Sequence, residues 1–143
     1  MLLAQMRPLV SHLLVRPFVE AYRLVADVLV HEDAQADSAR AASAEDTSAE
    51  VIRRALGLGQ QYVAQRRLRS AESVSVLLFQ TGLQVARNRG LLGNGDPGAD
   101  AELAARRAEF LDELRLLVRR LDRIEDLAIK RYIRDAVSVM PAD

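Results

Sequence analysis

The sequence predicts an all-α protein, a bundle of about five helices that includes an acidic flexible linker. Three observations predict this class. Large apolar residues recur at three- and four-residue steps over most of the 143 residues, which is the spacing of one face of a helix. No stretch of useful length alternates apolar and polar residues as a half-buried strand would. Two segments lack large apolar residues and divide the helical pattern.

Residues 1–30 are predicted to form N-terminal amphipathic helices. Their apolar stripe consists of Phe18, Tyr22, Val25, Val28 and Leu29. Glu20, Arg23 and Asp27 are expected to lie off this stripe, on the polar side. Arg16-Pro17 marks a predicted helix start because proline fits the first turn. A membrane span needs about 20 largely apolar residues, so these recurring charges predict that the segment does not cross a bilayer.

Residues 31–50 (HEDAQADSARAASAEDTSAE) are predicted to form a flexible acidic linker. They contain six acidic residues against Arg40 and no large apolar residue. Such a segment cannot bury enough surface to offset the entropy lost on ordering. At its end, Thr47 and Glu50 have the spacing of a capping box, which predicts that the next helix starts at Val51.

Residues 51–143 are predicted to form a helical bundle, in one domain with residues 1–30. A helix over Ser70–Asn88 is expected to be central and buried nearly all round, with Gly82 allowing a neighbouring helix to approach closely. Gly93–Gly98 predicts a turn. The longest predicted helix follows, with an apolar stripe of Leu103, Phe110, Leu111, Leu114, Leu117, Val118, Leu121, Ile124 and Ala128.

The composition offers little for catalysis. Without cysteine there is no disulfide, zinc ribbon or thiol nucleophile. His12 and His31 are the two imidazoles, and we expect the first to be packed within an apolar helix and the second to lie at a helix end. Gly93–Gly98 matches the glycine spacing of a dinucleotide fingerprint but follows a predicted helix and not a strand. We therefore predict no catalytic, metal or cofactor site in this chain.

An arginine-rich stretch is the strongest charge feature. From Val51 to Leu92 there are seven arginines against Glu72 alone, although the whole chain has no net charge. Such a surplus can attract an anion or a lipid headgroup, and Arg66, Arg67 and Arg69 are the candidate contacts. The alternatives are that these arginines meet the acidic linker or face water. The stretch lacks aromatic interleaving, so we expect no nucleic-acid partner.

Several segments resemble the C-terminal region of bacterial glycerol-3-phosphate 1-O-acyltransferase of the large membrane-associated type. They are RPFVEAYRLVADVLV at 16–30, QQYVAQRRL at 60–68, SAESVS at 70–75, LQVARNRGL at 83–91 and the closing helical segments from Ala101 onward. The composition looks like an actinobacterial version. The resemblance covers most of the chain and rests on a pattern of helices and not on catalytic signatures.

In that family a His and an Asp separated by four residues carry out the acyl transfer from acyl-CoA to glycerol 3-phosphate, the first step of phospholipid synthesis. This sequence departs from the motif, because Pro17 stands five positions after His12 and Ala36 five after His31. The resemblance thus implies a non-catalytic tail of the enzyme. Its expected partners are the catalytic domain of the same protein and the cytoplasmic face of the bacterial cell membrane, to which it would bind peripherally.

A second interpretation stays open at this point. The chain could be an independent helical interaction module, a homodimer for example, whose arginine-rich surface binds an acidic partner. The first interpretation predicts exposed apolar surface on the isolated chain, whereas the second predicts a well-behaved soluble particle with salt-sensitive binding. The sequence sets neither the acyl-chain preference of the enzyme nor the oligomeric state.

Overall fold

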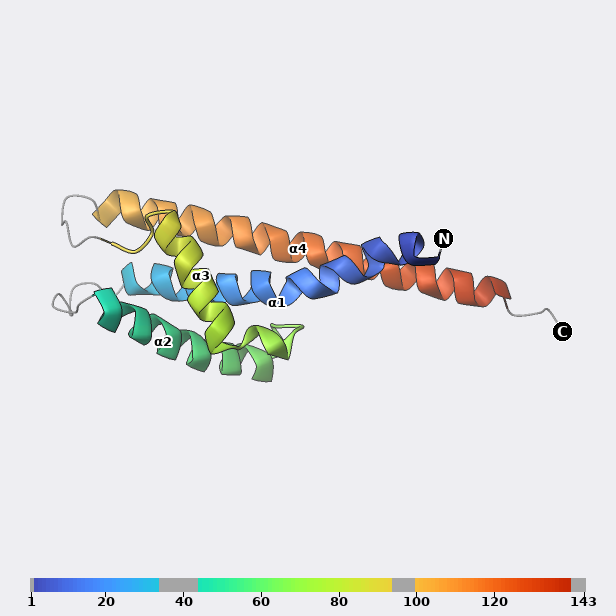
Figure 1. Cartoon of the computed structure of the whole chain (residues 1–143), viewed down its shortest axis with the longest axis horizontal. Coiled ribbons are helices and arrows are strands. Elements are labelled where there is room, and N and C mark those ends of the chain that lie inside the picture. Colours follow the sequence, from blue (N-terminus) through green and yellow to red (C-terminus); the bar gives the residue numbers. More distant parts are fainter. Residues whose placement is uncertain (1, 34–43, 94–99, 140–143) are drawn as a thin grey trace.

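The computed structural model describes residues 2–33, 44–93 and 100–139, with side chains described within 12–31, 48–93 and 101–134. Over these residues every regular element is helical, which confirms the predicted all-α class. The elements are α1 (Leu2–Asp33), α2 (Ala44–Ala64), the short 3-10 turn η1 (Ala71–Ser73), α3 (Val76–Asn88) and α4 (Asp100–Val139) (Figure 1). The described residues thus contain four α-helices, where the sequence predicted about five.

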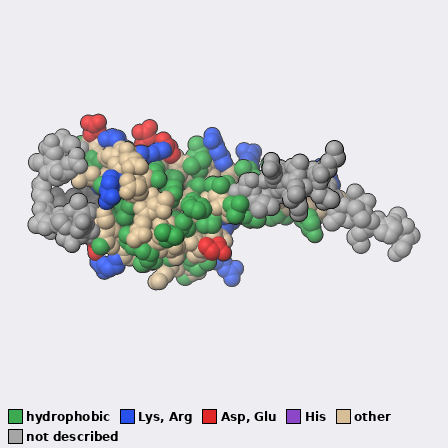
Figure 2. All heavy atoms as spheres, in the orientation of Figure 1, with side chains coloured by type: hydrophobic (Ala, Val, Ile, Leu, Met, Phe, Trp, Pro, Cys, Tyr) green, Lys and Arg blue, Asp and Glu red, His purple; other side chains and the backbone are tan. Residues whose placement is uncertain are grey.

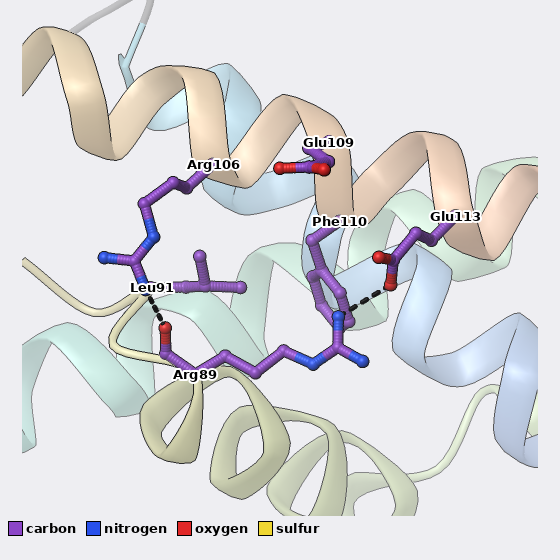
Figure 3. A pocket seen from close by; sticks show the side chains of 6 residues that line it. All are labelled: Arg89, Leu91, Arg106, Glu109, Phe110 and Glu113. Carbon is purple, nitrogen blue, oxygen red and sulfur yellow. Dashed lines mark hydrogen bonds and ion pairs between the residues drawn. The ribbon is translucent and has the colours of Figure 1, made fainter.

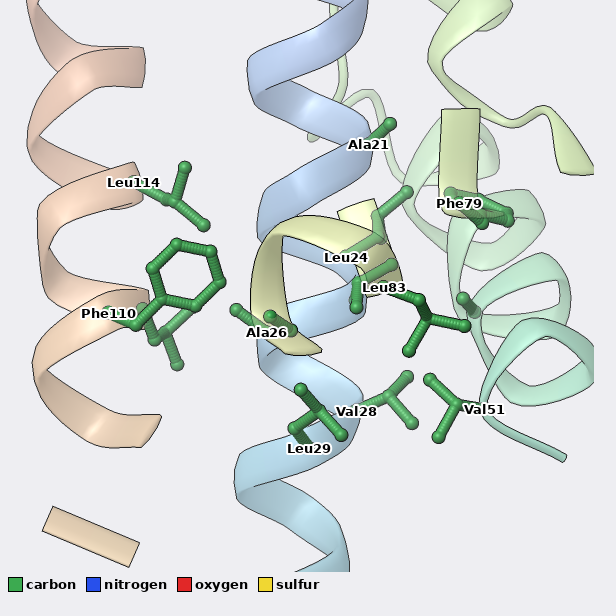
Figure 4. Packing of buried hydrophobic residues seen from close by; sticks show 14 of the residues in the cluster. Ala21, Leu24, Ala26, Val28, Leu29, Val51, Phe79, Leu83, Phe110 and Leu114 are labelled. Carbon is green, nitrogen blue, oxygen red and sulfur yellow. The ribbon is translucent and has the colours of Figure 1, made fainter. Parts of the chain in front are cut away.

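Helix α1 is the centre of the bundle, because it contacts α2, η1, α3 and α4. Helix α4 runs antiparallel along one side of α1, while α2 and α3 cover the other side over only part of its length (Figure 1). Figure 4 shows the core, with Leu24 and Leu29 of α1 placed between Phe110 of α4 and the residues of α2 and α3. Most of the core therefore lies at the end of the molecule where α2 and α3 pack.

The predicted stripe of α1 is confirmed in part. Val25, Val28 and Leu29 are buried and belong to the core, and Tyr22 packs against it. Phe18 is 46% exposed, so its assignment to the buried stripe was wrong. Its position along α1 explains this, because the core cluster begins at Val19.

The predicted burial of Ser70–Asn88 was also wrong. Helix α3 begins only at Val76, after the η1 turn, and its buried residues are Phe79, Gly82, Leu83 and Ala86. Leu77 is 69% exposed, since α3 packs against α1 and α2 with one face only. The close approach at Gly82 is confirmed: a Cβ atom there would lie 3.0 Å from Cδ1 of Tyr22. A side chain at this position would require Tyr22 to shift by a few tenths of an ångström.

Two predicted helix starts were wrong as well. Helix α1 continues through Pro17, although a proline inside a helix lacks the N–H that would bond to the carbonyl of Leu13 and its ring crowds that carbonyl. Helix α2 begins at Ala44, because alanine has the highest helix propensity, so the segment Thr47–Glu50 lies inside it.

Residues 31–33 and 44–50 of the predicted linker are therefore helical. Its remaining residues, 34–43, lie outside the described residues, as do residues 94–98 of the predicted turn. The division into 1–30, 31–50 and 51–143 stays a prediction.

Candidate functional site

The most unusual feature of α1 is a set of buried charges. The side chains of Arg16, Glu20 and Asp27 are exposed by 4%, 2% and 3%. The sequence pattern placed Glu20 and Asp27 on the polar side of the helix, and this was wrong. A charged group loses its hydration when it is buried, so each of these side chains requires partners inside the protein.

Arg16 contacts two carboxylates of α4 and one of α1. Its guanidinium lies 2.9 Å from Oδ1 of Asp122, 3.0 Å from Oε2 of Glu125 and 3.3 Å from Oε1 of Glu20. Arg69 reaches the same two α4 carboxylates, at 3.0 Å from Glu125 and 3.4 Å from Asp122. These five residues, here called the charged network, join α1, α4 and the segment between α2 and η1.

Glu20 fixes the backbone within this network. Its two carboxylate oxygens accept hydrogen bonds from the backbone N–H groups of Arg69 and Ser70, at 3.2 and 3.1 Å. Charge-assisted bonds of this kind are about twice as strong as neutral ones. Glu20 therefore holds the start of the η1 segment against α1.

Asp27 is held differently. Its Oδ1 lies 3.3 Å from a guanidinium nitrogen of Arg115 on α4, and its Oδ2 lies 3.7 Å from Nε of Arg23. Neither Oδ2 of Asp27 nor Nε of Arg23 has a hydrogen-bond partner among the described residues. Burial raises the pKa of Asp27, although both neighbouring arginines act to lower it. The Asp27 carboxylate thus accepts fewer hydrogen bonds than that of Glu20.

The ring of Tyr62, near the end of α2, contacts two guanidinium groups. The guanidinium of Arg67 lies 4.3 Å from the centre of the Tyr62 ring, and that of Arg23 lies 6.0 Å from it. Cations are attracted to the negative face of an aromatic ring. Arg66 follows α2 with a φ of 55°, in the left-handed region.

The structure separates the three predicted contact residues. Arg69 belongs to the charged network, Arg67 lies over Tyr62, and Arg66 is exposed. Arg23 lies beside Arg67 at the ring of Tyr62, and Arg115 lies beside Arg23 at the carboxylate of Asp27. The sequence prediction did not include Arg23 or Arg115. The four-residue spacing of Arg23 and Asp27 was the available signal, since it places both on one side of a helix.

A shallow pocket of about 240 Å³ lies between α4 and the end of α3. It is lined by Arg89, Leu91, Arg106, Glu109, Phe110 and Glu113 (Figure 3). Arg89 lies 2.6 Å from Glu113 and stacks on the ring of Phe110 at 4.9 Å, while Arg106 donates to the carbonyl of Arg89. Arg89, Glu113 and Arg106 are therefore engaged with one another and with the backbone.

The two histidines do not form a site. His12 is buried, and its Nδ1 has no hydrogen-bond partner among the described residues, whereas His31 is exposed near the end of α1. In the part of the chain that the structure describes, no three potential metal ligands come together.

The remaining candidate surface is apolar. Beyond α2 and α3, α1 and α4 continue side by side (Figure 1), and we call residues 12–18 and 116–134 of these helices the arm. Its exposed apolar residues are Leu13, Leu14, Val15, Phe18, Leu116, Leu117, Ile124, Leu127, Ile129, Tyr132 and Ile133. Figure 2 shows apolar side chains at the surface on the face it presents. None of the described helices is both long and apolar enough to span a membrane.

Comparison with known proteins identifies the helical pattern. A family model of the glycerol-3-phosphate acyltransferase C-terminal region matches residues 2–95. The chain belongs to this family. It is also 42% identical over 122 residues to proteins named "Putative acyltransferase plsB1" from Mycobacterium bovis and Mycobacterium tuberculosis. The aligned residues are 84% of this chain and 17% of each relative.

The family match confirms the resemblance that the helical segments predicted. The chain spans less than a fifth of the length of these mycobacterial relatives. No solved structure matches the chain. The family model covers α1, α2, η1 and α3, and therefore the residues of the charged network on α1 and Arg69, whereas α4 lies beyond the matched residues.

Proposed function

We propose that this chain is a non-catalytic helical part of a glycerol-3-phosphate 1-O-acyltransferase, and that its arm packs on the catalytic domain of the same protein. The enzyme would transfer an acyl group from acyl-CoA to glycerol 3-phosphate, the first step of phospholipid synthesis. It would act at the cytoplasmic face of the bacterial cell membrane, to which it would bind peripherally.

The exposed apolar surface of the arm carries this proposal. Soluble monomers rarely expose large contiguous apolar patches, and such patches mark interaction surfaces. In the arm, Leu14 is 67% exposed, Leu127 61% and Tyr132 76%. The relatives are several times longer than this chain, which supplies a candidate for the covering surface.

The absence of the family's catalytic pair from this sequence supports the non-catalytic part of the proposal. Pro17 and Ala36 occupy the positions where His12 and His31 would each need an aspartate. An imidazole without an orienting carboxylate is poorly placed to act as a general base. Arg16 and Glu20 bond to each other, to the backbone and to carboxylates of α4, which is a structural role.

The test is to produce this chain and the acyltransferase catalytic domain as separate polypeptides and to measure copurification and acyl transfer. We expect the two to copurify, and Leu127→Asp on the arm to abolish this by placing a charge in the interface. Gln80→Asp introduces the same charge on the exposed side of α3 and should leave copurification unchanged. Equal binding of both variants would contradict the proposal.

The alternative, an independent interaction module, makes a different prediction for the same surface. If a second copy covers the arm, the chain alone should form a dimer that dissociates on dilution, and Leu127→Asp should yield a monomer. A membrane partner would show instead as flotation of the chain with lipid vesicles. Copurification with the catalytic domain in the absence of dimers would favour the enzyme-part proposal over both.

A further inference from the structure

The end of α2 has an arginine in a position that favours glycine. The backbone N–H of Arg67 donates to the carbonyl of Tyr62 at 2.8 Å, and that of Arg66 donates to Val63 at 3.0 Å. This is the Schellman pattern, in which the left-handed residue, here Arg66, is usually glycine because a Cβ atom is strained there. A residue other than glycine in this strained conformation suggests that its side chain has a function.

Three further guanidinium groups gather next to this turn. Arg67 and Arg23 share the ring of Tyr62, and Arg23 and Arg115 share the carboxylate of Asp27. They come from α1, from the turn after α2 and from α4. Positively charged groups repel one another, so three guanidinium groups that share two partners favour the binding of an anion between them.

The carboxylates in contact with these arginines do not balance them. Three arginines (Arg23, Arg67 and Arg115) stand against Asp27 and Asp112, which lies 3.4 Å from Arg115, and 3 − 2 leaves one positive charge. Arg66, the exposed residue that precedes Arg67 in the chain, adds a second positive charge beside them. The acidic residues further along α4 are engaged elsewhere, because Asp122 and Glu125 contact Arg16 and Arg69.

We infer that Arg23, Arg66, Arg67 and Arg115 form a binding site for a phosphate group. The planar guanidinium fork matches the oxygens of a phosphate and can bind it through two parallel hydrogen bonds. A phosphate monoester carries about −1.5 to −2 charges at neutral pH, which matches the local surplus. The group could belong to a free phosphate ester or to a phospholipid headgroup. This inference does not depend on what covers the arm.

The first experiment is calorimetric titration of the full chain with inorganic phosphate at low ionic strength. We expect saturable binding that weakens by about tenfold in Arg67→Gln and in Arg115→Gln, since each removes a charged hydrogen-bond donor. Arg120→Gln is the matched control, because it removes the same charge from an exposed position on the other side of α4. No binding, or equal weakening by Arg120→Gln, would overturn the inference.

Arg66→Gly separates binding from folding. Glycine relieves the strain of the left-handed position, so this variant should melt at a higher temperature than the wild-type chain. It also lacks the guanidinium, so it should bind phosphate several-fold more weakly. A variant that is more stable and binds phosphate unchanged, together with unchanged binding by Arg67→Gln, would show that the arginines serve only the helix end.

Vesicles distinguish the two sources of phosphate. The chain is mixed with phosphatidylcholine vesicles that contain phosphatidic acid, and its flotation is measured with and without inorganic phosphate. Flotation that phosphate and Arg67→Gln both reduce supports the site with a lipid headgroup as its ligand. Phosphate binding without flotation supports the site with a free phosphate ester as its ligand, and the absence of both overturns it.

Discussion

Large apolar residues are buried at one end of the α1–α4 pair and exposed at the other. Where α2 and α3 pack, Leu24 and Phe79 are fully buried. In the arm, Phe18 on the same helix as Leu24 is 46% exposed, and Leu127 on α4 is 61% exposed. The sequence pattern of both ends is similar, so the difference arises from the number of helices available to cover them. Four helices form a core, whereas two leave apolar sides uncovered.

The charged network connects α1 and α4 within the arm and reaches the core end through Glu20 and Arg69. Arg16 on α1 donates directional hydrogen bonds to Asp122 and Glu125 on α4, and these bonds use little apolar surface. The apolar side chains of the arm therefore remain free for another surface. The core end buries its apolar side chains, and the arm end leaves many of them exposed.

A matched pair of phenylalanines tests this difference most directly. Phe79→Ala should reduce the free energy of unfolding by about 3–5 kcal/mol, because it removes a fully buried ring and leaves a cavity. Phe18→Ala removes a half-exposed ring and should cost less than about 1 kcal/mol in the isolated chain. Urea unfolding followed by circular dichroism measures both.

A similar loss in the free energy of unfolding for both variants would contradict this view. It would mean that the arm contributes to the core of the isolated chain. The pair also bears on partner binding. When the catalytic domain is added, Phe18→Ala should weaken the association of a folded chain, whereas a partner surface elsewhere on the molecule would leave association unchanged.

Glu20→Ala should have the next largest effect. The change leaves the backbone N–H groups of Arg69 and Ser70 without their acceptor and removes one carboxylate from Arg16. Removing one partner from a buried charged cluster typically costs about 3 kcal/mol or more. Because Asp122 and Glu125 still neutralise Arg16, we place the loss at about 2–3 kcal/mol, measured by thermal and urea unfolding.

Glu20→Gln provides the control for this prediction. It removes the charge and replaces one acceptor oxygen with an NH2 donor, but the remaining carbonyl oxygen can still accept from one of the two backbone N–H groups. Its loss should therefore be smaller than that of the alanine variant. Equal stability of Glu20→Ala and the wild-type chain would show that water replaces the carboxylate and that the network does not hold the η1 segment.

The sequence predicted the helical class and the family, because both depend on periodicity and on extended segments. It also predicted the close approach at Gly82, which follows from a glycine within an apolar helix. It did not predict that Glu20 and Asp27 are buried, since periodicity counts charged residues as solvent-facing and cannot see distant partners. The partner of Asp27 on α4 lies 88 residues away, and the backbone partners of Glu20 lie 49 and 50 residues away.

The candidate site shows the same limit. Arg66 and Arg67 could be selected from an arginine-rich stretch, but Arg69 also belonged to that stretch and is bound within the charged network. Arg23 and Arg115 join the site only through the packing of α1 against α4. Charge counting along the chain therefore finds a region, and the fold decides which of its residues are free to bind a ligand.

The ionisation of Asp27 should have the smallest effect on stability, and the direction of its pH dependence follows from its raised pKa. Because burial raises its pKa in the folded chain, the folded state binds a proton more readily than the unfolded state. The stabilising contribution of the neutral form is present at low pH and is lost as the pH rises above about 4, the usual value for aspartate. Asp27→Asn cannot ionise, so the stability of wild type relative to this variant should fall between pH 4 and pH 7.

Glu50 supplies a control of opposite sign. Hydrogen bonds from Arg53 and Arg54 lower the pKa of Glu50, so its contribution is present above the usual value of about 4.3 and is lost as the pH falls. The stability of wild type relative to Glu50→Gln should thus fall on acidification, whereas that relative to Asp27→Asn should rise. Urea unfolding at several pH values measures both, and slopes of the same sign would show that Arg23 and Arg115 outweigh the burial of Asp27.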